Sequence, residues 1–155
     1  MIVNGIGKHS ELLVPGRSDF ECPIADWPVR LFPGSLNVRV SGYPDEFVRR
    51  GLRRSIAALD SAGFEPEFTI PQAQLGNNRL TPVLGMPDRG NAQVWRASLS
   101  ANGLERTCWA LRRIGSALTQ DIEIVSSVSL RTSLGAERVR DWPAVVTMQG
   151  RWRTL

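Results

Sequence analysis

The sequence has few of the residues that several common kinds of functional site require. Its 155 residues include two cysteines, Cys22 and Cys108, and one histidine, His9. Because no Cys-x-x-Cys pair is present, the common zinc sites are excluded, and a Ser-His-Asp triad could be built only on His9. The two cysteines could form one disulfide, but in an intracellular chain of this size we expect them to be reduced, buried and inert.

Long apolar runs are also missing. No apolar stretch approaches the roughly 20 residues that a membrane-spanning helix needs, and no basic segment followed by an apolar one marks a secretory signal near residue 1. We therefore expect a soluble, cytoplasmic protein that does not associate with membranes. The length predicts a single domain, residues 1–155, with one hydrophobic core.

Lysine is almost absent, because 18 of the 19 basic residues are arginine and only Lys8 is lysine. The net charge of +4 favours phosphate or carboxylate ligands, since a guanidinium group binds both in a bidentate manner. A general preference for arginine codons would give the same composition. Charge alone therefore does not separate a nucleotide-binding enzyme from a nucleic-acid-binding protein.

Hydrophobic periodicity predicts many short strands and one clear helix. The helix is expected over residues 44–62, with an arginine-rich face that is either solvated or bound to nucleic acid. A hairpin is expected where Ser100-Ala101-Asn102-Gly103 joins two strands, residues 92–99 and 108–112. Further strands are predicted at residues 35–40, 68–70 and 122–125, and at the end of the tail formed by residues 139–148. This pattern is typical of a mainly β protein with one or two helices that forms a compact β-barrel.

Three segments contain residues suited to chemistry. The first is a glycine loop with one cation, in which backbone N–H groups and Lys8 could approach phosphate oxygens, although a simple turn would also explain it. It consists of Gly5, Ile6, Gly7, Lys8, His9 and Ser10. In the second, Ser35 and Asn37 follow a Pro33-Gly34 turn and share one face of the next strand. Their oxygens could bind magnesium, or they could bond their own backbone.

The third segment is Ile122-Glu123-Ile124-Val125, where a carboxylate interrupts an apolar strand. Glu123 either faces solvent by simple alternation or points into a pocket in which it must find a hydrogen-bond donor. Polar residues follow directly, up to Arg131. The alternation alone leaves both possibilities open.

The order of these segments resembles the archaeal CTP-dependent riboflavin kinases. The resemblance lies in the glycine loop, in Leu31-Phe32-Pro33-Gly34-Ser35-Leu36-Asn37-Val38, and in Ile122-Glu123-Ile124-Val125 followed by Leu130-Arg131. Those enzymes are cradle-loop (RIFT-like) barrels that phosphorylate riboflavin to FMN. The resemblance spans nearly the whole chain but depends on short motifs. It departs from the family at His9, where a third glycine is common, and at Asp141, where an Asp-Gly-Asp segment is usual.

The resemblance implies a role for each segment. Ser35 and Asn37 would hold Mg²⁺, the glycine loop would wrap the nucleotide, and Glu123 would contact the flavin or remove its proton. Ser116 is the possible counterpart of a flavin-contacting threonine. Contacts to the nucleotide base would come from Val128, Ser129, Leu130 and Arg131.

We therefore expect a kinase that transfers a phosphoryl group from CTP to riboflavin or a related small molecule, with Mg²⁺ as cofactor. The alternatives are a barrel that senses a nucleotide or flavin without catalysis and a barrel that binds DNA. The sequence does not fix the acceptor, the nucleotide base, the oligomeric state or whether turnover is retained.

Overall fold

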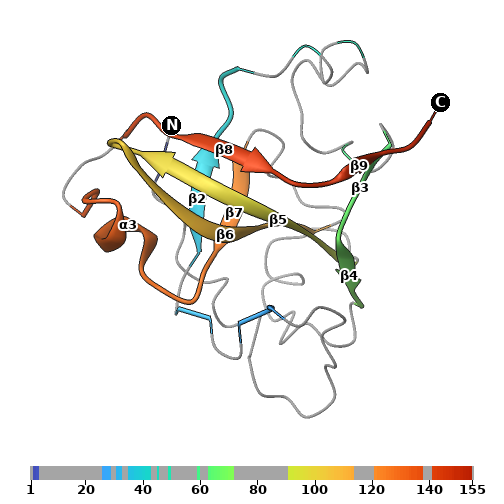
Figure 1. The fold of residues 1–155 in the computed structure, drawn as a ribbon, viewed down its shortest axis with the longest axis horizontal. Coiled ribbons are helices and arrows are strands. Elements are labelled where there is room, and N and C mark those ends of the chain that lie inside the picture. Colours follow the sequence, from blue (N-terminus) through green and yellow to red (C-terminus); the bar gives the residue numbers. More distant parts are fainter. Residues whose placement is uncertain are drawn as a thin grey trace, which may run out of the picture.

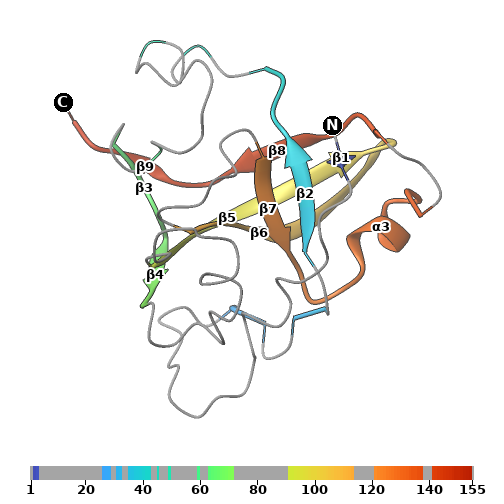
Figure 2. The ribbon, with the colours of Figure 1, turned by 180° about the vertical axis from the view of Figure 1, so that it is seen from behind.

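The computed structural model describes residues 2–3, 26–28, 31–32, 35–42, 45, 49, 59, 63–71, 91–113, 121–137 and 141–154. Within these residues the chain is mainly β, as the sequence predicts, and the helix whose bounds are described is α3 (Leu130–Ser133). Figures 1 and 2 show the strands from opposite sides, with α3 beside the tip of the longest hairpin. None of the helices among the described residues is both long and apolar enough to cross a membrane.

The longest hairpin joins β5 (Ala92–Ala101) to β6 (Leu104–Arg113). Its two-residue turn consists of Asn102 and Gly103, which have φ angles of 53° and 71°. Positive φ at both positions is the geometry of the type I′ turn, which matches the twist of the flanking strands. The hairpin predicted from the sequence is thus confirmed, but its second strand begins at Leu104 rather than at Cys108.

The hairpin forms the middle of a seven-stranded sheet. The strands run in the order β1-β2-β7-β6-β5-β4, and β8 pairs with β5 beside β4. The other strands of this sheet are β1 (Ile2–Val3), β2 (Leu36–Arg39), β4 (Phe68–Ile70), β7 (Asp121–Val125) and β8 (Val145–Met148). A separate pair consists of β3 (Phe64–Glu65) and β9 (Arg151–Trp152).

Among the described strands, no pairing joins β1 to β4 or β8. The described sheet is therefore open, and the closed barrel implied by the resemblance is not seen in it. The strands predicted at residues 35–40, 68–70 and 122–125 are confirmed as β2, β4 and β7, and the tail forms β8.

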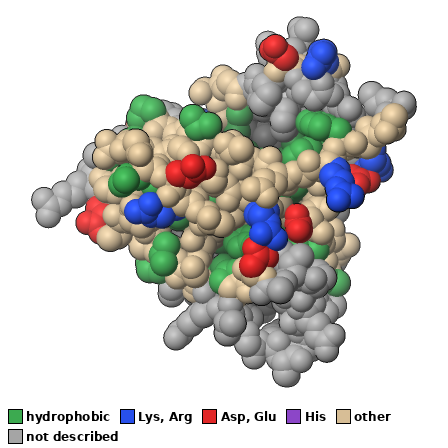
Figure 3. All heavy atoms as spheres, in the orientation of Figure 1, with side chains coloured by type: hydrophobic (Ala, Val, Ile, Leu, Met, Phe, Trp, Pro, Cys, Tyr) green, Lys and Arg blue, Asp and Glu red, His purple; other side chains and the backbone are tan. Residues whose placement is uncertain are grey.

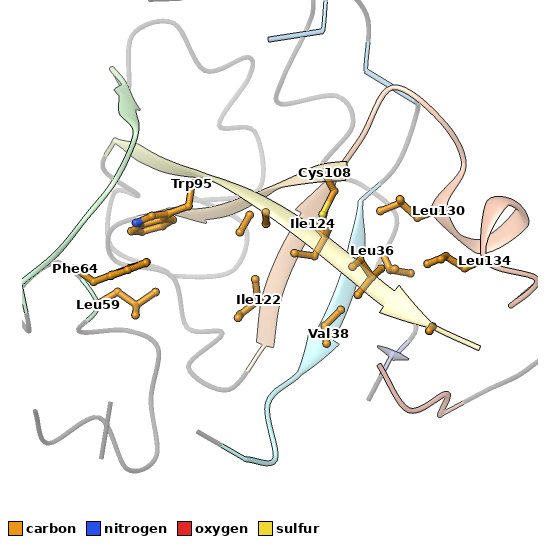
Figure 4. Close-up of a cluster of buried hydrophobic side chains, with 14 residues drawn as sticks. Leu36, Val38, Leu59, Phe64, Trp95, Cys108, Ile122, Ile124, Leu130 and Leu134 are labelled. Carbon is orange, nitrogen blue, oxygen red and sulfur yellow. The ribbon is translucent and has the colours of Figure 1, made fainter. Parts of the chain in front are cut away.

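The sheet buries apolar side chains on both faces. The first cluster lies on the face formed by β2, β7, β6 and β5, where Leu36, Ile124 and Cys108 are buried. Figure 4 shows it extending from Leu59, Phe64 and Trp95 to Leu130 and Leu134 near α3. The second cluster lies on the opposite face and contains Leu31, Phe68, Ile70, Ala92, Val94, Trp109, Leu111 and Val125.

Two other expectations are only partly covered by the described residues. In the helix predicted over residues 44–62, Asp45 and Arg49 are helical, whereas Leu59 lies in a turn and is buried. The remaining positions of that helix lie outside the described residues. Cys108 is a buried free thiol, as expected, and Cys22 also lies outside them.

Candidate functional site

Two predicted site residues from distant segments, Asn37 and Glu123, are direct neighbours in the sheet. β2 and β7 are antiparallel, and their register pairs Asn37 with Glu123. Residues that face each other across antiparallel strands project to the same side, with Cα atoms about 4.5–5.5 Å apart. The fold therefore brings the proposed metal ligand and the proposed acceptor-binding carboxylate together.

Strand alternation explains which face the pair occupies. Leu36 and Val38 on β2 pack in the first core cluster, together with Ile122 and Ile124 on β7 (Figure 4). Successive residues of a strand point to opposite faces, so Asn37 and Glu123 project away from that cluster. They lie on the same face as Leu111, which is paired with Glu123 and belongs to the second cluster.

This polar pair is partly removed from solvent. Asn37 is only 7% exposed, and its Oδ1 atom has no hydrogen-bond partner among the described residues. Glu123 is half-buried, with its Oε1 atom buried. A buried carbonyl oxygen that makes no hydrogen bond is costly, so a cation or a donor from a ligand would be favourable beside Asn37.

An ion pair lies two residues beyond Asn37 and Glu123, on the same face of β2 and β7. Arg39 is the cross-strand neighbour of Asp121, and it donates from Nε to Oδ1 at 2.9 Å and from Nη2 to Oδ2 at 3.3 Å. The hydrogen bond to Asp121 and the charge of this carboxylate raise the pKa of Arg39 above its usual value. The pair fixes the register of β2 against β7 at the end beyond Asn37 and Glu123.

Ser35 lies near the opposite end of this strand pair. It is half-buried and directly precedes β2. The N–H of Phe32 donates to the carbonyl of Ser126, which directly follows β7, at 2.8 Å. The chain before Ser35 is thereby held against the end of β7.

The oxygens present fit a hard cation better than a soft one. The Oδ1 atom of Asn37 accepts no hydrogen bond from the described residues, and the Ser35 hydroxyl is two residues away. Within the described ranges, no group of three or more His, Cys, Asp or Glu residues could hold a metal. Magnesium commonly takes few protein ligands and completes its shell with water and phosphate oxygens, so these residues fit that ion.

The segment predicted to contact the nucleotide base has clear structural roles of its own. Ser129 is the N-cap of α3, and its Oγ atom accepts a hydrogen bond from the N–H of Thr132 at 3.3 Å. Leu130 is 5% exposed and packs in the first core cluster. Arg131 donates from Nη1 to the carbonyl of Ala136 at 3.4 Å. Among the four predicted contacts, Val128 presents the most exposed side chain, at 47%.

The remaining predicted site residues lie outside the described residues. They are Gly5, Ile6, Gly7, Lys8, His9, Ser10 and Ser116. The backbone of Val3, which shortly precedes the glycine loop in sequence, pairs with Asn37. The chain therefore leaves β1 beside the Asn37 and Glu123 pair.

Sequence reasoning missed the burial of two adjacent cations, Arg112 and Arg113, of which Arg113 is 7% exposed and Arg112 has a buried nitrogen without a partner among the described residues. Arg112 was predicted only as the last residue of a strand, yet it is 9% exposed, and the nitrogen concerned is Nη1. Its cross-strand neighbour Gln93 is 4% exposed. Strand alternation could have indicated the burial of Arg112, because Arg112 shares a strand face with Cys108 and Ala110.

Comparison of the chain with protein-family models, with curated proteins and with solved structures gave no match.

Proposed function

We propose that this protein is a nucleotide-dependent phosphotransferase, with CTP as the phosphate donor and riboflavin or a related small molecule as the acceptor. The observation that supports the proposal is the direct cross-strand pairing of Asn37 with Glu123. These residues come from the two most specific motifs of the resemblance, which lie far apart in the sequence. Asn37 is buried and Glu123 is half-buried, and the register of β2 and β7 places both on one face of the sheet.

The proposed reaction transfers the γ-phosphoryl group. The acceptor hydroxyl oxygen forms a bond to the γ-phosphorus while the bond to the β,γ-bridging oxygen breaks, which releases CDP. The carboxylate of Glu123 accepts the hydroxyl proton. Most of the rate enhancement in such reactions comes from positioning and from neutralisation of phosphate charge, so one acid/base group is sufficient.

Asn37 and Ser35 would hold Mg²⁺, which when bound neutralises charge on the phosphate oxygens. Lys8 and the backbone of Gly5 and Gly7 would bind the phosphates. The face that presents Glu123 continues into the second apolar cluster, where Trp27 packs against Phe68 with ring centroids 5.2 Å apart. Such an apolar, aromatic surface would suit a flat ring system in the acceptor.

The proposal includes a fold and a location. We propose that the open sheet is part of a cradle-loop barrel, which the central position of β2, β7, β6 and β5 supports. We also propose that the protein acts in the cytoplasm. The buried free thiol of Cys108 is consistent with a reducing compartment.

The charge distribution gives less support to the alternative of DNA binding. Arg39, Arg96 and Arg153 each form an ion pair with a carboxylate. Figure 3 shows several basic side chains beside acidic ones rather than gathered into one basic patch on the face that it draws. Arginines paired in this way are less available for a phosphate backbone.

A binding panel tests the proposal first. Calorimetric titration with CTP, ATP and GTP, with and without magnesium, should show magnesium-dependent binding of CTP that changes little with salt. A DNA binder would instead bind duplex DNA and lose roughly a thousandfold in affinity between about 50 and 200 mM salt. Binding of DNA with that salt dependence, and no response to CTP, would refute the proposal.

Turnover tests the role of Glu123. Glu123→Gln should lower the rate of riboflavin phosphorylation at saturating acceptor by about 10²- to 10⁴-fold while CTP affinity stays unchanged. Glu105→Gln is the matched control, because Glu105 is an exposed carboxylate on β6, on the same face of the sheet as Glu123. If both variants turn over at the parent rate, Glu123 is not the proton acceptor.

A further inference from the structure

Arg112 is a charged side chain buried at the end of an apolar strand face. Along β6 it follows Cys108 and Ala110, which belong to the first core cluster. Its neighbour across β5 is Gln93, and Trp95, the next residue on that face of β5, is fully buried. Arg112 is 9% exposed, so more than nine-tenths of it is removed from water.

One nitrogen of this guanidinium is buried without a hydrogen-bond partner. It is the Nη1 atom, which makes no hydrogen bond within the part of the chain that the structure describes. Burial lowers the pKa of Arg112 below its usual value, yet arginine remains protonated in proteins. A buried charge without a partner is strongly destabilising, whereas a buried polar group in contact with a ligand is a common feature of binding sites.

The site differs from the Asn37 and Glu123 pair. Leu111 is paired with Glu123, so the adjacent Arg112 projects to the opposite face of β6. A ligand at Arg112 therefore lies across the sheet from the proposed phosphotransfer site. The inference does not depend on the proposed function.

We propose that Arg112 and Gln93 bind the carboxylate of a small organic acid. A guanidinium group binds a carboxylate through two parallel N–H···O bonds, and the side-chain amide of Gln93 can donate a third. One buried positive charge is neutralised by a monoanion, whereas a phosphate dianion would leave excess negative charge in the same apolar surroundings. Trp95, two residues from Gln93 on the same face of β5, favours an acid with an apolar body.

Thermal unfolding in the absence of nucleotide tests this site, with benzoate as the probe and chloride and phosphate at matched ionic strength. For a Kd of about 1 mM, about 10 mM benzoate should raise the melting temperature by about 3–6 °C over chloride. Phosphate should give a smaller rise. If benzoate gives no rise in the parent protein, the proposal is refuted, and an equal rise with phosphate would refute the assignment to carboxylates.

Two variants test whether the stabilisation by benzoate arises at Arg112. Arg112→Met removes the charge but keeps the length of the side chain, so it should melt at a higher temperature than the ligand-free parent and bind benzoate about thirtyfold more weakly. Arg106→Met is the control, because Arg106 lies on the same face of β6 and donates to the carbonyl of Glu105. Unchanged benzoate binding in Arg112→Met, or equal losses in both variants, would overturn the proposal.

Discussion

Replacement of Asn37 by leucine should stabilise the protein while it weakens the proposed magnesium-dependent binding of nucleotide. Asn37 is 7% exposed between Leu36 and Val38, and its Oδ1 atom accepts no hydrogen bond from the described residues. A buried polar group without a partner costs about 1–3 kcal/mol, and leucine has a similar size with no polar atom. Allowing for imperfect packing, we expect Asn37→Leu to raise the free energy of unfolding by about 1–2 kcal/mol.

Urea unfolding is the appropriate measurement, and the m-value should stay unchanged. The melting temperature should rise by about 2–8 °C. Thr69→Val is the control for a general effect of apolar strand residues, because Thr69 is exposed and should change stability by less than about 0.5 kcal/mol. Magnesium-dependent CTP affinity should fall at least about tenfold in Asn37→Leu. A loss of stability greater than about 1 kcal/mol would refute the reasoning, since it would mean that the amide makes a stabilising hydrogen bond.

Three further predictions concern single residues. Gly150→Ala should lower the free energy of unfolding by about 1–3 kcal/mol, because a Cβ atom there would lie 2.5 Å from the Phe64 ring; unchanged stability in urea would contradict this. Ser129→Ala should cost about 1 kcal/mol through loss of the α3 N-cap, and Ser129→Asp should recover most of it, both measured by urea unfolding. Burial raises the pKa of the Cys108 thiol to about 12, so the native thiol should resist alkylation at about pH 8, as checked by mass mapping. Because the unfolded thiol ionises first, the contribution of Cys108 to stability should be lost as pH rises above 9.0, the usual pKa of a cysteine thiol. Rapid alkylation in the native state would contradict this prediction.

Local sequence signals were sufficient for the elements whose structure depends on neighbouring residues. Asn102 and Gly103 specify the turn of the β5 and β6 hairpin, since few other residue pairs adopt positive φ at both positions. The start of β6 was predicted four residues too late because residues 104–107 are mostly exposed and lack the apolar alternation that was used. The strands β3 and β9 have only two residues each, which is too short to leave a periodic signal.

The candidate site needed information that no local pattern contains. Alternation placed Glu123 on the opposite face from Ile122 and Ile124, and it placed Ser35 and Asn37 on one face. It did not give the pairing of β2 with β7, which fixes Asn37 opposite Glu123 across a long stretch of chain. The burial of Arg112 was missed for a related reason, because arginine is usually exposed and only the sheet shows that its strand face is covered.

Asn37 and Arg112 are the two positions at which the sheet buries a side chain with an unsatisfied polar atom and at which we propose a ligand. Each is at least nine-tenths buried, and each has a polar atom without a hydrogen-bond partner among the described residues. They project to opposite faces, because Asn37 lies beside Glu123 whereas Arg112 is adjacent to Leu111, the residue paired with Glu123. Apolar residues at both positions would satisfy the core better, so the polar residues lower the stability of the ligand-free protein. Ligand binding at either position would offset that cost, because any molecule that binds only the folded state shifts the unfolding equilibrium towards it.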